Sequence, residues 1–266
     1  MIVATHGILA NSGAGSVDTD AQAFITAAGI TNTTQQNAIN TLVTDLKSYN
    51  IWTKMKAIYP FVGGSASSHK WNLKDPRDLD AAFRLVFNGG WTHSSTGALP
   101  NGTTGYADTK LKPNNILTLN SNSLGYYSGS NITETNPDMC NMGSFNSVTQ
   151  AFLVAKLNSR HASRTNGNEL SYNSTSMTGF NTASRQSSTV GVINVNGVNV
   201  VTGTANGTLP TENVWLGNLN TFNFAYNGWV KNDFRFAYIS DGLSNSESAN
   251  FYTAVQAYQT SLGRNV

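Results

Sequence analysis

Residues 190–202 read Val-Gly-Val-Ile-Asn-Val-Asn-Gly-Val-Asn-Val-Val-Thr, two apolar runs joined by Asn196-Gly197. An Asn-Gly pair suits a type I′ turn, because both central residues of that turn need a positive φ. The two-residue turn predicts these strand pairs: Val195 with Val198, Asn194 with Asn199, Ile193 with Val200, and Val192 with Val201. One face of the hairpin is then aliphatic, and we expect it to be buried between two sheets. The members of that face are Ile193, Val195, Val198 and Val200.

Short apolar segments of this kind recur from residue 54 onward, between clusters of Gly, Asn, Ser and Thr. We expect strands at 57–62, 82–87, 124–127, 151–157, 190–195, 198–202, 214–216 and 234–239. Many short strands separated by turn residues predict a mainly β fold, an antiparallel sandwich or jelly roll. A parallel α/β sheet is disfavoured because no helical pattern recurs between the strands.

Helical spacing occurs only near the two ends. Residues 20–28 and 34–49 each place apolar side chains on one face, and Gly29 suits the left-handed end of the first helix. Near the C-terminus, Ser244 and Glu247 form a capping box before a helical pattern that ends at Gly263. We therefore divide the chain into an N-terminal helical segment, 1–50, and a jelly-roll domain with a C-terminal helix, 51–266. The first segment either packs on the sandwich, which we favour, or forms a separate anchor.

The composition is low in charge. Charged residues make up 11% of the chain, against roughly 25% in ordinary soluble domains. The net charge of +2 comes without basic runs, so nucleic acid is not an expected partner. No run approaches the ~18 apolar residues of a membrane span. Cys140 is the only cysteine, which excludes an intramolecular disulfide and a thiolate metal cage.

Patterns of catalytic residues are missing as well. Glycosidases use two carboxylates across the scissile bond, and on a strand a Glu-x-Asp or Glu-x-Glu pair would put both on one face. Each of the four glutamates, Glu134, Glu169, Glu212 and Glu247, lacks a carboxylate two residues away. Carboxylates from distant strands can still converge in space, so a hydrolase is disfavoured without being excluded. We expect a protein that is not an enzyme.

We expect no metal or other cofactor. Asp75, Asp78 and Asp80 form one acidic cluster, which we interpret as a turn whose charge is balanced by Lys74 and Arg77 rather than as a calcium loop. The four histidines are scattered without the spacing of zinc ligands.

Aromatic side chains are the candidates for ligand binding. A ring offers a flat apolar face to a sugar, and nearby Asn or Ser side chains supply hydrogen bonds. Trp91 and His93 follow Gly89-Gly90, which places them in or beside a loop, and Tyr106 is the third candidate. The alternative for each is a structural aromatic in the core or at a strand end. Trp215 lies within an apolar strand, so we assign it to the core.

The C-terminal half resembles a known fold family. Three landmarks occur in order: Val192–Gly197, then Val214-Trp215-Leu216-Gly217, then Phe234–Ile239 leading into the Ser244 helix cap. Together they are similar to the concanavalin A-like, laminin-G-like jelly roll. The resemblance implies an antiparallel lectin-like sandwich.

A second resemblance covers nearly the whole chain. It is carried by residues 20–30, 51–64, 69–76, 87–94 and 250–256. These segments resemble a module of structural proteins in phages and prophages of the Bacteroides–flavobacterium group. No catalytic residues come with this resemblance.

The resemblance implies a virion surface protein, a spike, fibre or capsid decoration that is made in the host bacterial cytoplasm. Its partners would be other virion proteins and identical subunits in a homo-oligomer, with a host surface glycan as a possible ligand. The alternatives are a stand-alone carbohydrate-binding module and, after it, a polysaccharide-cleaving enzyme.

Overall fold

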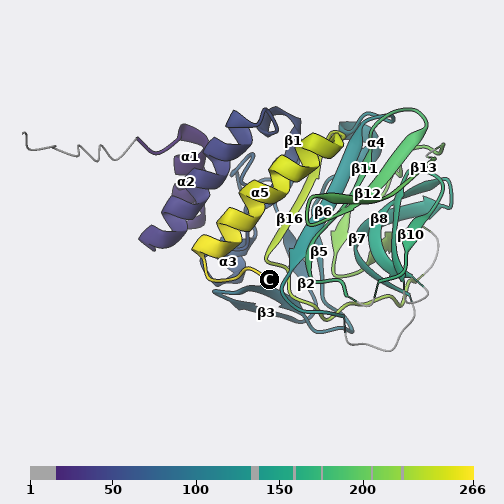
Figure 1. Cartoon of the computed structure of the whole chain (residues 1–266). Coiled ribbons are helices and arrows are strands. Elements are labelled where there is room, and N and C mark those ends of the chain that lie inside the picture. The colour runs from purple at the N-terminus through teal and green to yellow at the C-terminus, as the bar shows by residue number, and fades with distance from the viewer. Residues whose placement is uncertain (1–15, 133–137, 158–159, 175, 205, 223–224) are drawn as a thin grey trace, which may run out of the picture.

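The computed structural model describes residues 16–132, 138–157, 160–174, 176–204, 206–222 and 225–266, and it consists of two packed sheets with helices on one side (Figure 1). The first sheet, here the inner sheet, has six antiparallel strands. Their order is β1 (Met55–Tyr59), β16 (Phe236–Ser240), β6 (Asn122–Ser128), β11 (Gly179–Arg185), β12 (Val190–Val195) and β13 (Val198–Thr204).

The second sheet, here the outer sheet, has eight strands. Seven follow one another in the order β10 (Leu170–Tyr172), β9 (Arg160–Thr165), β8 (Gln150–Leu157), β7 (Met139–Ser147), β14 (Trp215–Leu216), β5 (Tyr106–Asp108) and β2 (Val86–Asn88). The eighth, β15 (Leu219–Thr221), pairs with β7 in parallel. A separate hairpin joins β3 (Trp91–Ser94) to β4 (Gly97–Pro100). The predicted fold class, a mainly β antiparallel sandwich with terminal helices, is confirmed.

Alternation along the strands gives the inner sheet two buried faces. In β16, Ala237 and Ile239 point into the core between the sheets, whereas Phe236 and Tyr238 point to the helices. The core between the sheets includes side chains from both layers: Leu124, Tyr126, Ala183, Ala107, Met142, Phe152, Val154 and Leu216. The inner sheet is therefore the middle of three layers, and the outer sheet keeps one face toward solvent.

Three long helices cover the inner sheet (Figure 1). They are α1 (Thr19–Ala28), α2 (Thr33–Ser48) and α5 (Asn245–Ser261), and α2 packs on α5. The shorter helices are α3 (Ala66–His69), α4 (Pro113–Ile116) and the 3-10 turns Trp52–Lys54 and Asp80–Ala82. None of the helices in the described ranges is long and apolar enough to cross a membrane.

The predicted helix ends are confirmed. Gly29 has a φ of 65° and closes α1, and Ser244 and Glu247 form the expected capping box of α5. Phe24 of α1 and Leu42 of α2 share one apolar cluster with Tyr238 of the inner sheet. The division of the chain at residue 50 stays a prediction, while α1 and α2 themselves lie packed in the helical layer.

The hairpin at 190–204 agrees with the prediction at its turn and differs further away. Asn196 and Gly197 have φ values of 49° and 75°, as a type I′ turn requires. A bulge follows, so Ile193 pairs with Val201 instead of Val200. Ile193 is buried, but Val198 is 63% and Val200 40% exposed. The predicted buried aliphatic face is thus wrong for Val198 and Val200, because β13 is an edge strand with one neighbour in the sheet.

Candidate functional site

A pocket of about 280 Å³, here the aromatic pocket, lies on the solvent side of the outer sheet where β5, β14 and β15 meet the loop that follows. Its lining combines four aromatic rings with amide and hydroxyl side chains. The lining residues are Tyr106, Trp215, Asn218, Leu219, Asn220, Thr221, Ala225, Tyr226 and Trp229.

Strand alternation explains why the rings face outward. Ala107 of β5 and Leu216 of β14 are core residues, so Tyr106 and Trp215 point to the opposite face of the outer sheet. Their rings stack with centroids 4.0 Å apart and an interplanar angle of 26°. The Trp229 ring lies 6.3 Å from Tyr106. The assignment of Trp215 to the core is therefore wrong: the side chain is half-buried and belongs to the pocket wall.

Polar atoms without partners accompany these rings. Among the described residues, nothing pairs with Nε1 of Trp215, Oδ1 of Asn218 or the hydroxyl of Tyr226. Asn218 is only 2% exposed, and its Nδ2 donates to the Tyr226 carbonyl at 3.2 Å. Burial raises the pKa of the Tyr226 phenol, with smaller contributions from Cys140 and Asp138, so the hydroxyl stays neutral. These three atoms are themselves buried, so a ligand in the pocket bonds to them only where the surrounding side chains move.

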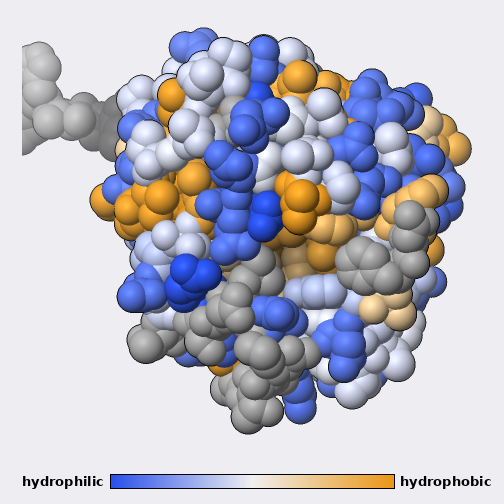
Figure 2. Space-filling view, turned by 90° about the vertical axis from the view of Figure 1, so that its right-hand side faces the viewer, coloured by the Kyte–Doolittle hydropathy of each residue, from blue (hydrophilic) through white to orange (hydrophobic). Residues whose placement is uncertain are grey.

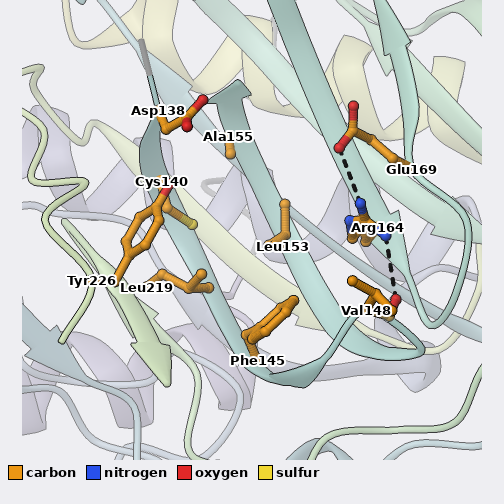
Figure 3. A pocket seen from close by; sticks show the side chains of 10 residues that line it. All are labelled: Asp138, Cys140, Phe145, Val148, Leu153, Ala155, Arg164, Glu169, Leu219 and Tyr226. Carbon is orange, nitrogen blue, oxygen red and sulfur yellow. Dashed lines mark hydrogen bonds and ion pairs between the residues drawn. The ribbon is translucent and has the colours of Figure 1, made fainter. Parts of the chain in front are cut away.

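A second pocket, here the aliphatic pocket, adjoins the first and has a volume of about 270 Å³ (Figure 3). The two pockets share Leu219 and Tyr226. Side chains of β7 and β8 form most of the floor, and Figure 3 shows Arg164 and Glu169 on the side opposite Tyr226 and Leu219. The other lining residues are Asp138, Cys140, Phe145, Val148, Leu153 and Ala155.

The surface around the outer sheet is mixed in polarity. Figure 2 shows the right-hand side of the molecule in Figure 1, hollowed near its middle, with apolar side chains gathered there and hydrophilic ones around them. An apolar recess with a polar surround is typical of sites for small ligands.

Of the three residues predicted from sequence, Tyr106 lies in the aromatic pocket. Trp91 and His93 lie outside it, on β3. The Trp91 Nε1 donates to the carbonyls of Asn88 and Tyr106, at 3.1 and 3.3 Å, so this tryptophan supports Tyr106 from behind. Whether Trp91 or His93 contacts a ligand stays a prediction.

His93 forms a pair with buried His69. Their Nδ1 atoms are 2.9 Å apart, so one ring donates to the other. Burial, followed by the nearby charge of His93, lowers the pKa of His69 to about 3. Burial also lowers the pKa of His93. The pair is therefore neutral near pH 7.

Sequence reasoning missed Asn218, Asn220 and Tyr226, while Trp229 was among the aromatic residues that could stack on a sugar. The available signal was local: Trp215 is followed at short spacing by Asn218 and Asn220, and four further aromatics come within the next ten residues. Because such residues are common in turns, the pattern alone does not show which of them face one pocket.

The acidic cluster forms ion pairs, as a turn would. Asp75 pairs with Arg77 as predicted, at 2.7 Å. Lys70 and Arg84 pair with Asp78 and Asp80, whereas Lys74 lies over the Trp52 ring instead. Within the described part of the chain, no group of three His, Cys, Asp or Glu side chains is placed to hold a metal ion.

Comparisons with known proteins show the fold. No family model and no curated protein matches the chain. Among solved structures, a mutant Trypanosoma rangeli sialidase displaying trans-sialidase activity gives a TM-score of 0.54 at 8% identity, over 84% of this chain and 39% of that one. A botulinum neurotoxin type C structure gives 0.53 at 12% identity, over 79% and 53% of the two chains. The botulinum neurotoxin serotype D binding domain gives 0.50 at 9%, over 77% and 52%.

The chain thus spans about half the length, or less, of these three neighbours. At identities this low, the three matches show that the β-sandwich fold is shared and show nothing further about this chain.

Proposed function

We propose that this protein is a carbohydrate-binding β-sandwich and that a sugar ring stacks in the aromatic pocket. The observation that carries the proposal is the combination, in one pocket, of the Tyr106, Trp215 and Trp229 rings with the amide side chains of Asn218 and Asn220.

The chemistry of the pocket fits a sugar. One face of a pyranose presents C–H groups that pack on an aromatic ring, while its hydroxyls both donate and accept hydrogen bonds. The lining includes Asn218, Asn220 and Thr221, whose amide and hydroxyl groups are of the kind that donate to and accept from sugar hydroxyls.

The fold comparison supports the same class of ligand. Botulinum neurotoxin type C depends on interaction with two ganglioside molecules to enter cells. The Trypanosoma rangeli protein is a sialidase whose mutant displays trans-sialidase activity. For this chain these neighbours suggest only that the shared sandwich is a scaffold used by glycan-recognising proteins.

We propose binding without cleavage. The described lining of the aromatic pocket contains no carboxylate, and in the adjoining pocket Glu169 forms ion pairs with Arg164 and Arg160. These ion pairs hold the Glu169 carboxylate against two arginines, whereas a glycosidase needs two carboxylates placed across the scissile bond. Incubation of the protein with the glycan that it binds is therefore expected to release no reducing ends.

The test is a glycan array followed by titration calorimetry with the best ligand. Replacing Trp229 by Ala removes one ring and is expected to weaken binding about tenfold, equivalent to about 1.4 kcal/mol. The matched control is Trp71→Ala, which removes a half-buried tryptophan from the helical side. Wild-type protein that binds no glycan, or equal affinities for Trp229→Ala and Trp71→Ala, would contradict the proposal.

We further propose that the module acts on the surface of a phage virion as a homo-oligomer. This proposal rests on the resemblance of the segments 20–30, 51–64 and 250–256, which lie in α1, around β1 and in α5. The helical layer would then face other virion proteins, which leaves the aromatic pocket on the opposite side free for a host glycan. Light scattering of the purified protein should give a multiple of the 28.5 kDa chain mass. A strict monomer would count against this role.

A further inference from the structure

We propose that the aliphatic pocket is a second sugar subsite and that it selects a neutral residue carrying an acetamido group. The inference rests on the proposed function, since it extends the glycan from the aromatic pocket into its neighbour. The ligand is then an oligosaccharide that contains an N-acetylhexosamine.

The two pockets adjoin. Tyr226 and Leu219 line both, so a glycan that occupies both pockets would pass these two side chains. Gly143 of β7 lies at this junction, because it pairs with Trp215, Leu219 and Leu153 on the adjoining strands. A Cβ at Gly143 would come within 2.5 Å of the Leu153 Cβ. Because Gly143 has no side chain, it adds no bulk between the two pockets.

The floor of the aliphatic pocket is apolar. Cys140 and Ala155 face each other across β7 and β8, and Leu153 and Leu219 complete one buried cluster with them. Burial raises the pKa of the Cys140 thiol far above its usual value, so the sulfur remains a neutral thiol. A methyl group packs favourably on such a floor, whereas a sugar hydroxyl placed there would lose its hydrogen bonds to water.

The polar side of the pocket fits an amide rather than an acid. Arg164 is already engaged: its Nη2 is 3.1 Å from Glu169, and its Nη1 donates to the carbonyls of Val148 and Gly167 at 3.2 and 3.0 Å. Arg160 also lies 3.6 Å from Glu169. A sugar carboxylate would thus meet an arginine whose charge is neutralised, with Glu169 and Asp138 also on the lining.

An acetamido group uses both parts of this lining. Its methyl suits the floor at Ala155 and Leu153, and its N–H is a donor for the carboxylate oxygens of Glu169. A deoxy sugar offers the methyl alone, and an acidic sugar offers a charge that the lining disfavours.

The experiment compares three classes of oligosaccharide on one array: neutral with N-acetylhexosamine, neutral without it, and acidic. Wild-type protein is expected to bind the first class at least tenfold more tightly than matched glycans with a hydroxyl in place of the acetamido group. Ala155→Phe, which fills the pocket from its floor, should abolish this preference and keep the weaker binding through the aromatic pocket. Trp229→Ala should weaken binding of all classes.

A second variant tests the inference independently, in case Ala155→Phe does not fold. Glu169→Gln keeps the size of a side chain at the pocket edge and removes its negative charge, so it should reduce the preference for N-acetylated over acidic glycans severalfold. Glycan binding that is lost in Trp229→Ala but shows no acetamido preference, or that prefers acidic glycans, would overturn this inference and leave the proposed function standing. Failure of the wild type to bind any glycan would overturn both.

Discussion

Tyr106 and Trp215, far apart in the sequence, stack their rings with centroids 4.0 Å apart on the solvent face of the outer sheet. The stack exists because β5 and β14 are adjacent strands in which Ala107 pairs with Leu216. Pairing of the strands therefore creates the platform of the aromatic pocket before any ligand arrives.

Tyr106→Ala is expected to remove half of this platform and to weaken glycan binding about tenfold. Tyr106→Phe keeps the stacked ring and should bind within about twofold of wild type. Titration of both variants with the best array ligand checks the prediction. Equal loss in the two variants would show that the phenol hydroxyl, rather than the ring, is what the ligand needs.

Arg264 ties the C-terminus to the fold. Its guanidinium donates to the carbonyl of Phe61 at 2.7 Å, to those of Pro60 and Arg235, and to Oε1 of Gln259 at 3.0 Å. Arg264→Met removes the donor to the Phe61 carbonyl and to Gln259 Oε1, whereas the Pro60 and Arg235 carbonyls keep Tyr258 and Gln259 as donors, so we expect the free energy of unfolding to fall by about 3 kcal/mol in urea titrations.

The control for Arg264 is Arg77→Met, which removes an exposed arginine that pairs with Asp75. A surface ion pair contributes about 0–1 kcal/mol, so this variant should unfold close to wild type. Similar urea midpoints for Arg264→Met and Arg77→Met would mean that the buried hydrogen bonds contribute little.

The 196–197 turn needs residues that accept a positive φ. Replacing Asn196-Gly197 by Val-Val is expected to lower the free energy of unfolding by about 1–3 kcal/mol. A Cβ at Gly197 would also lie 2.8 Å from the Cβ of Tyr252 on α5. Thermal melting measures the loss, and Val198→Thr, at an exposed position beside the turn, is the matched control. A melting temperature equal to that of the control would argue against the type I′ turn.

Features set by local chemistry were predictable from the sequence. Asn196-Gly197 determines its own turn, and the Ser244 cap and Gly29 determine helix ends. β7 and β11 were missed because they are rich in Asn, Ser and Gly instead of aliphatic residues. In β11 the buried hydroxyls find partners on neighbouring elements, as where Ser184 Oγ donates to the Leu243 carbonyl at 3.1 Å. Periodicity of apolar residues does not reveal strands of this kind.

The site was harder to predict than the fold. Tyr106 and Trp215 are brought together by strand order in the outer sheet, and Trp229 joins them from the segment between β15 and β16. Strand order depends on contacts between distant segments. The misassigned Val200 has the same origin, because a bulge in an edge strand shifts the pairing by one residue. The sequence therefore indicated that aromatic side chains form the pocket. Which of the aromatic residues line it depends on how distant strands pair in the folded protein.

Acid should destabilise the protein through two buried histidines. Burial lowers the pKa of both His69 and His161 to about 3. In the unfolded chain each has a pKa of about 6.5, so above that pH neither state takes up a proton and stability is constant. Below it the unfolded state binds the protons first, and stability falls by about 1.4 kcal/mol per pH unit for each histidine until the folded pKa is reached.

Between pH 6.5 and pH 5 this amounts to about 2 kcal/mol for each histidine, a window in which most carboxylates stay ionised. Urea titrations across this window should therefore show a loss of about 4 kcal/mol from these two groups in the wild type, to which the lowered pKa of His93 adds. His161→Phe retains a ring of similar volume in the site beside Tyr172 and removes one titrating group, so its loss should be smaller by about 2 kcal/mol. The comparison of slopes within each protein makes the result independent of any change in stability that the substitution causes at neutral pH. Identical slopes for the variant and the wild type would mean that His161 is protonated in the folded protein, and that its burial between the strands is less complete than the structure shows.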